Sequence, residues 1–155
     1  MREQLAEAVK TAMKSGDKQR LSTLRLIQAA IKDRDIAARV DGKGASTGQD
    51  QISDAELLQL LQKMIKQRRE SVKVYTEGGR QELADQEQAE IAIIEEYLPK
   101  QMSQAEVEAA VKSVIEELDA TGLKDMGRTM GVLKQRYAGQ MDFGKASGIV
   151  KAQLN

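Results

Sequence analysis

The stretch of this sequence that comes closest to a catalytic motif is GQMDFGKA, residues 139–146. It nearly matches the phosphate-binding pattern GxxxxGK[ST], in which backbone N–H groups and a lysine hold phosphates while the final hydroxyl ligates Mg²⁺. Ala146 stands at that final position and cannot supply a hydroxyl. The preceding residues, VLKQRYA, favour a helix, whereas a phosphate-binding loop follows a strand. We therefore do not expect nucleotide binding here.

Glu95 and Glu96 are the next candidates, as a carboxylate pair for acid–base chemistry. Adjacent helical residues point about 100° apart, so a solvated face is the better interpretation. The chain contains neither cysteine nor histidine, which removes thiolate chemistry, the near-neutral proton shuttle and the commonest metal ligand. No nucleophile–base pair and no metal-ligand cluster is found. We predict no catalytic residue, no metal site and no cofactor.

The overall composition is that of an ordered globular protein and not that of a disordered or membrane protein. Hydrophobic residues make up 41% of the 155 and charged residues 31%, and 24 basic residues balance 24 acidic ones. No apolar run approaches the ~20 residues needed to cross a bilayer, and the N-terminal MREQLAEAVK is amphipathic rather than a signal peptide. These features favour a cytoplasmic location and predict no membrane partner.

Nearly every segment has an apolar period of 3.6 residues, which predicts an all-α fold. Two Ser-x-x-Glu capping boxes, beginning at Ser53 and Ser103, mark helix starts. Residues 41–50, DGKGASTGQD, have almost nothing to bury and favour a mobile loop that connects two helices. The expected helices cover residues 2–14, 17–40, 53–77 and 80–98, and three shorter ones begin near residues 103, 125 and 142.

Pro99 is the only proline and falls where two groups of helices meet. Proline clashes with the preceding helical turn, so the fourth helix should stop near Leu98. We predict an N-terminal domain, residues 1–98, with four helices and a long helical hairpin. Residues 99–155 then form a C-terminal three-helix bundle. The alternative is a simple turn within one domain.

Charge is distributed unevenly along the predicted hairpin. Residues 63–80 hold six bases, and residues 82–96 hold six acids and no base. Arg68 occupies an otherwise apolar stripe, at the level of Glu87 and Glu90 on the other arm. We predict that these charges pair across the hairpin.

Three further bases, Lys66, Arg69 and Lys73, share the other face of the same helix. A solvated charged face is the favoured interpretation, and contact with an anion or RNA is the alternative.

The C-terminal part repeats the asymmetry. Residues 103–123 hold five acids and one base, whereas residues 124–151 hold six bases against two aspartates. Such a local positive surface suits a phosphate backbone, although helices also place bases late to suit their dipole. The six bases are Lys124, Arg128, Lys134, Arg136, Lys145 and Lys151.

Two glycine pairs fall inside the predicted helices of this part. Gly127 and Gly131 lie one turn apart, as do Gly144 and Gly148. A glycine inside a helix costs ~1 kcal/mol relative to alanine, so the four call for a tertiary reason. Either they allow close approach of two helices, or they expose backbone to a ligand or RNA phosphate.

Residues 66–103, KQRRESVKVYTEGGRQELADQEQAEIAIIEEYLPKQMS, resemble the signature of the stand-alone GatB/YqeY family, and the resemblance extends over essentially the whole chain. Residues 125–154, DMGRTMGVLKQRYAGQMDFGKASGIVKAQL, also resemble the tail domain of the B subunit of the tRNA-dependent glutamyl/aspartyl amidotransferase. The resemblance implies an N-terminal helical bundle followed by a three-helix tail-like domain.

The resemblance also implies a role near tRNA. In the amidotransferase the tail helps to hold the tRNA, which makes the six C-terminal bases our candidate tRNA contacts. The kinase-like portion and the amidase subunit have no counterpart in this chain, so we expect a non-catalytic accessory whose partners are tRNA or a protein of the amidation or translation machinery. Two alternatives remain: a contributor to glutamine-dependent amidotransferase activity within a complex, and a helical protein–protein adaptor.

Overall fold

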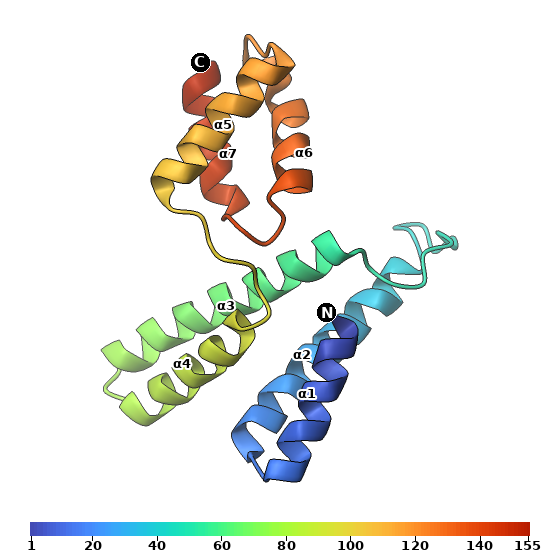
Figure 1. Ribbon diagram of the computed structural model, residues 1–155, viewed down its shortest axis with the longest axis vertical. Coiled ribbons are helices and arrows are strands. Elements are labelled where there is room, and N and C mark those ends of the chain that lie inside the picture. The colour runs from blue at the N-terminus through green and yellow to red at the C-terminus, as the bar shows by residue number, and fades with distance from the viewer. The chain divides into compact units, whose positions relative to one another are not determined.

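A computed structural model describes all of residues 1–155 and confirms the predicted all-α class (Figure 1). It contains no β-strand; the one β-type pairing is an isolated bridge between Val40 and Ser46. The helices are α1 (Arg2–Ser15), α2 (Lys18–Ala38), α3 (Asp54–Glu77), α4 (Gln81–Glu95), α5 (Gln104–Leu118), α6 (Met126–Arg136) and α7 (Phe143–Leu154), with a 3₁₀ turn, η1 (Leu123–Asp125), before α6.

The chain divides into two compact units, Met1–Tyr97 and Leu98–Asn155. The first contains α1 to α4, coloured blue to yellow-green in Figure 1, and the second contains α5 to α7, coloured gold to red. Whether these units are independently folding domains with a boundary at Pro99 stays a prediction.

Local sequence accounts for where most helices begin. In both predicted capping boxes the serine side chain accepts a hydrogen bond from the glutamate backbone N–H, and the glutamate side chain accepts one from the serine N–H. The Oγ atoms of Ser53 and Ser103 lie 3.1 and 3.2 Å from the glutamate nitrogens. Each box satisfies backbone N–H groups that have no partner within the helix.

The end of α4 differs from the prediction. The helix stops at Glu95 rather than near Leu98. The N–H groups of Glu96 and Tyr97 bond to carbonyls three residues back, at 3.3 and 3.1 Å, so the last turn tightens. Pro99 disfavours the helical conformation of the residue before it, and the chain leaves the helix earlier than the apolar pattern alone indicates.

The loop of residues 41–50 carries its own hydrogen bonds. An Oδ1 atom of Asp41 accepts from the N–H groups of Lys43 and Ala45 at 2.8 and 2.9 Å. The Asp41 N–H in turn donates to the Ala45 carbonyl at 2.8 Å. This is a side-chain-supported turn of the kind that aspartate favours.

A buried carboxylate ties three parts of the first unit together. Asp35 accepts two hydrogen bonds from the Arg2 guanidinium, at 2.8 and 2.9 Å, and one from the Ile52 N–H at 2.8 Å. It thereby joins the start of α1, the end of α2 and the segment before α3. Its hydrogen bonds with Arg2 are the main reason that the pKa of Asp35 is lowered. No local sequence pattern had indicated this residue.

The α3–α4 hairpin contains a cross-arm ion pair at the level predicted for Arg68. The Nε atom of Arg68 lies 2.9 Å from an Oε atom of Glu90, and both side chains are largely buried, at 15% and 13% exposure. The partner is Glu90 and not Glu87. Burial, and then the like charge of Glu90, raises the pKa of Glu87, while the charge of Arg68 acts against this.

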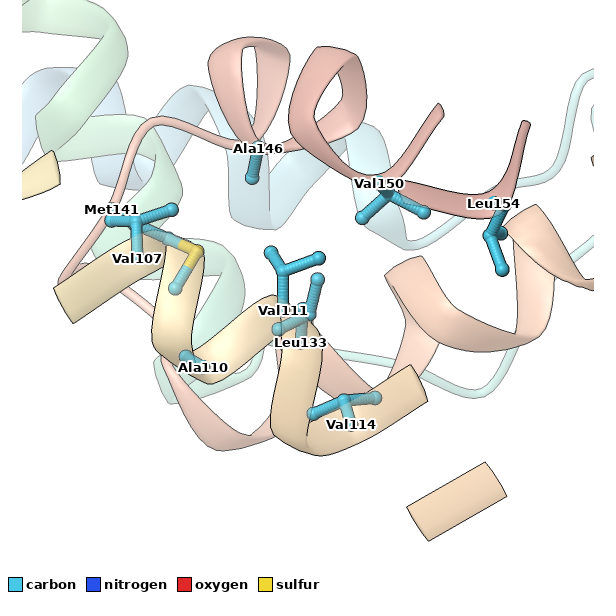
Figure 2. Close-up of a cluster of buried hydrophobic side chains, with 9 residues drawn as sticks. All are labelled: Val107, Ala110, Val111, Val114, Leu133, Met141, Ala146, Val150 and Leu154. Carbon is cyan, nitrogen blue, oxygen red and sulfur yellow. The ribbon is translucent and has the colours of Figure 1, made fainter. Parts of the chain in front are cut away.

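The second unit is a three-helix bundle with its own core. Figure 2 shows apolar side chains of α5, α6 and α7 meeting between the helices, with Val111, Leu133 and Val150 near the centre. These three side chains are fully buried. The loop before α5 is fastened to the α6–α7 loop, because the Met102 N–H donates to the Gln140 carbonyl at 2.8 Å. This core fixes which sides of α6 and α7 face outward.

Candidate nucleic-acid interface

All six candidate bases of the second unit are exposed, but two are held by neighbouring carboxylates. Arg136 makes a two-pronged ion pair with Glu117 of α5, with one N–O distance of 2.6 Å. Arg128 lies 3.1 Å from the preceding Asp125. The pKa of Glu117 is lowered chiefly by its hydrogen bond to Arg136. Part of the positive charge expected from the sequence is therefore neutralised within the unit.

The remaining four bases are lysines, and none makes an ion pair. An unpaired ammonium on a flexible stem can meet an incoming anion without first breaking an internal bond. The four are Lys124, Lys134, Lys145 and Lys151.

The helices α6 and α7 share a repeat that reasoning from the sequence missed. GRTMGVLK, residues 127–134, and GKASGIVK, residues 144–151, share the order glycine, base, two residues, glycine, two residues, lysine. In each copy the third and seventh positions are buried, whereas the glycines and bases are exposed. The 17-residue spacing is visible in the printed sequence once the glycine pairs and the bases are considered together.

Each copy places its two glycines and its last lysine along one side of its helix, because these positions are three, four and seven residues apart. The first base follows the first glycine directly, so it points about 100° away from that glycine and lies at the edge of this side. We call these surfaces the Gly-Lys stripes. The stripe of α6 comprises Gly127, Arg128, Gly131 and Lys134, and that of α7 comprises Gly144, Lys145, Gly148 and Lys151.

The glycines of the stripes are not packed against another helix. A Cβ atom added at Gly127, Gly131 or Gly148 would meet no heavy atom within 4 Å beyond its own helical surroundings. At Gly144 the nearest atom would be Oδ1 of Asp142, 3.1 Å away. Close helix approach, the first explanation suggested by the glycine spacing, is therefore wrong in this unit. The stripes instead expose bare helix backbone between basic side chains.

The structure also agrees with the rejection of a phosphate-binding loop at residues 139–146. A helix, α6, precedes the segment, and no strand is present. The side chain of Asp142 accepts hydrogen bonds from the N–H groups of Gly144 and Lys145, at 2.8 and 3.2 Å. The first N–H groups of α7, which a phosphate would need, already bind this carboxylate.

The secondary basic face of α3 is also partly neutralised. Arg69 lies 3.0 Å from Glu95 of α4, in an exposed pair that links the two arms of the hairpin. Lys66 and Lys73 are exposed and make no ion pair. No group of three or more acidic, histidine or cysteine side chains is arranged to hold a metal ion. None of the helices has both the length and the apolar character required to span a membrane.

The fold and the stripes together define a small all-α protein in which two helices of the second unit each expose glycines and bases. The sequence profile of the family described as "Yqey-like protein" matches residues 2–154. The chain therefore belongs to the YqeY-like family.

Several curated relatives carry the name "Altered inheritance of mitochondria protein 41, mitochondrial". The protein from Pyrenophora tritici-repentis is 31% identical over 135 residues, which cover 85% of this chain and 68% of that protein. The protein from Lachancea thermotolerans is 32% identical over 74% of this chain and 57% of its own length. The protein from Kluyveromyces lactis is 30% identical over 96% and 72%. The family profile and these relatives therefore agree that the chain is a member of a protein family.

Proposed function

We propose that this protein is a non-catalytic accessory that binds the phosphate backbone of tRNA through the Gly-Lys stripes of α6 and α7. The observation that carries the proposal is the repeat itself. Two helices of one bundle expose the same set of two glycines and two bases. Gly131 and Gly148 lie in the helix interiors, where glycine lowers helix stability, and nothing is packed against them.

The chemistry of the stripes suits a polyanion. Lysine and arginine side chains bind phosphates mainly through charge and release counterions from the nucleic acid. A glycine between two bases removes the side chain that would otherwise hold a phosphate away from the helix surface. The backbone of an RNA strand could then approach closely enough for both flanking bases to contact it.

The choice of tRNA rests on the resemblance of residues 125–154 to the amidotransferase tail domain. The bases of the stripes suit the phosphate backbone of any nucleic acid. Only the resemblance indicates that this nucleic acid is tRNA. The process served would be tRNA-dependent amidation or translation. A cytoplasmic location stays part of the proposal, whereas the names of the fungal relatives carry the word mitochondrial.

Binding of fluorescently labelled tRNA, followed by anisotropy over a range of salt concentrations, tests the proposal. We expect the double variant Lys134→Ala/Lys151→Ala to weaken binding and to reduce the slope of log K against log salt by about two, roughly one for each phosphate that is no longer neutralised. The matched control is Lys100→Ala/Lys112→Ala, which removes two exposed lysines of the same unit away from the stripes.

The control variant should retain the salt slope and affinity of the wild type. Equal losses of affinity in the two variants would show that only the net charge matters. Absence of salt-dependent tRNA binding by the wild type would refute the proposed function.

A further inference from the structure

The outward face of α2 carries a regular row of bases that the tRNA proposal does not use. Lys18, Arg25 and Lys32 follow one another at seven-residue intervals, and Arg39, at the C-cap, continues the spacing. Residues seven apart lie nearly above one another along a helix. All four side chains are exposed and form a single basic row along α2.

None of these four bases makes an ion pair within the chain. Other charges of the same helix do have partners: Arg20 pairs with Glu96 beyond α4 at 2.9 Å, and the buried Asp35 pairs with Arg2 of α1 at 2.8 Å. The four bases of the row have no such partner.

An apolar seam runs beside the basic row. Leu26 and Ile36 are 44% and 48% exposed, and the small Ala29 lies between them on the same side of the helix. Met13 of α1, at 55% exposure, extends the apolar surface, because its sulfur lies 3.9 Å from a guanidinium nitrogen of Arg25. One acid, Asp33, interrupts this seam between Ala29 and Ile36.

The first half of this face is hollowed. A shallow depression of about 350 Å³ is bordered by apolar and basic side chains of α2, so an incoming side chain could contact both kinds at once. It is lined by Lys18, Leu21, Ser22, Arg25 and Leu26.

We propose that the outward face of α2 binds an amphipathic helix of another protein that carries acidic residues along one flank. An apolar seam flanked at seven-residue intervals by one sign of charge is the arrangement by which paired helices select partners. The unpaired charge is positive, so the complementary flank is acidic. A nucleic acid would use the basic row but would gain nothing from the exposed leucine and isoleucine. This inference is independent of the proposed tRNA function, which concerns the other unit.

Two synthetic peptides serve as probes for the full-length protein. Both have three heptads, to match the 21 residues of α2, with leucine at the seam positions. One carries glutamate on both flanks and the other carries lysine, so that neither pairs readily with itself. Anisotropy of the labelled peptides should show the glutamate peptide binding at least about tenfold more tightly than the lysine peptide.

Variants assign the binding to this face. The charge reversal Arg25→Glu/Lys32→Glu should invert the preference, so that the lysine peptide binds more tightly. The reversal Lys63→Glu/Lys66→Glu, at two exposed bases of α3, is the matched control and should leave the preference unchanged. Leu26→Ser, at an exposed seam position, should weaken both peptides without lowering the melting temperature by more than a few degrees.

Three results would overturn the inference. One is equal binding, or no binding, of the two peptides to the wild type. Another is a concentration-dependent dimer in analytical ultracentrifugation that Arg25→Glu/Lys32→Glu abolishes, since the occupant would then be a second copy of the chain. The last is loss of tRNA binding in that variant while peptide binding is absent throughout, because the face would then serve RNA.

Discussion

Replacing the stripe glycines by alanine should stabilise this protein. Gly131 and Gly148 lie in the interior of α6 and α7, and neither has a positive φ, so alanine fits the existing backbone. A Cβ atom at either position meets nothing within 4 Å beyond its own helical surroundings. The substitution therefore brings the helix propensity of alanine without a steric cost.

The magnitude follows from helix propensities. Each Gly→Ala change in an exposed helix interior contributes ~1 kcal/mol, so Gly131→Ala/Gly148→Ala should add about 2 kcal/mol to the free energy of unfolding of the second unit. For a unit of this size, 1 kcal/mol corresponds to about 4–8 °C, which predicts a rise in its melting temperature of roughly 8–16 °C. Circular dichroism at 222 nm, followed during thermal and urea unfolding, measures both quantities.

A second measurement on larger substitutions tests why glycine is present. Gly131→Leu/Gly148→Leu keeps good helix formers at both positions but fills the space between the bases of each stripe. We expect the leucine variant to be at least as stable as the wild type and to bind tRNA at least about tenfold more weakly, since the phosphates are held away from the lysines. Ala109→Leu, at an exposed position of α5, is the matched control and should leave tRNA binding unchanged.

Two outcomes would refute this reasoning. If Gly131→Ala/Gly148→Ala destabilised the protein, the glycines would be required for packing. If the leucine variant bound tRNA as tightly as the wild type, the exposed backbone would have no part in binding.

Two further predictions concern the first unit. Asp35→Ala should lower its free energy of unfolding by roughly 2–3 kcal/mol, because a partly buried guanidinium and a backbone N–H are left without their acceptor. The folded-state pKa of Asp35 is below its unfolded value of about 3.9, so its contribution to stability is fully present above that pH and is lost as pH falls through the folded pKa. Urea unfolding between pH 3 and 7 should therefore show that the free energy of unfolding falls less steeply at the acid end in Asp35→Asn than in the wild type. Across the hairpin, a double-mutant cycle of Arg68→Met and Glu90→Leu should give a coupling of ~1–3 kcal/mol, with the double variant more stable than either single one; additive losses of stability would show that the pair contributes nothing.

The features that local sequence predicted correctly are those that depend on neighbours in the chain. Both capping boxes need only a serine and a glutamate three residues apart, and both formed. The cross-arm partner of Arg68 was predicted to within one turn, because a two-arm hairpin fixes which levels face one another. The end of α4 was predicted too late. The apolar pattern continues to Leu98, but the helix ends at Glu95 because Pro99 disfavours a helical conformation in the residues before it.

The features that escaped prediction depend on interactions between distant elements. Asp35 follows Ile31 by one turn on the buried side of α2, where the apolar period of the helix by itself gives no sign of a carboxylate. Its guanidinium partner is 33 residues away and its backbone partner 17, so no local pattern identifies them. Likewise, the pairing of Arg136 with Glu117 requires knowing how α5 and α6 face each other. The number of bases in the sequence of the second unit therefore overestimates the positive charge that is free to bind a ligand.

The chain as a whole is neutral, yet it exposes positive surfaces because arginine and lysine are used differently. Seven bases take part in ion pairs, and six of them are arginines. The planar guanidinium suits fixed, two-pronged pairing with a carboxylate, whereas a lysine ammonium is a point charge on a flexible stem. Arginine thus makes most of the ion pairs within the fold, whereas the lysines of the stripes and the bases of the α2 row, Arg25 and Arg39 included, remain unpaired.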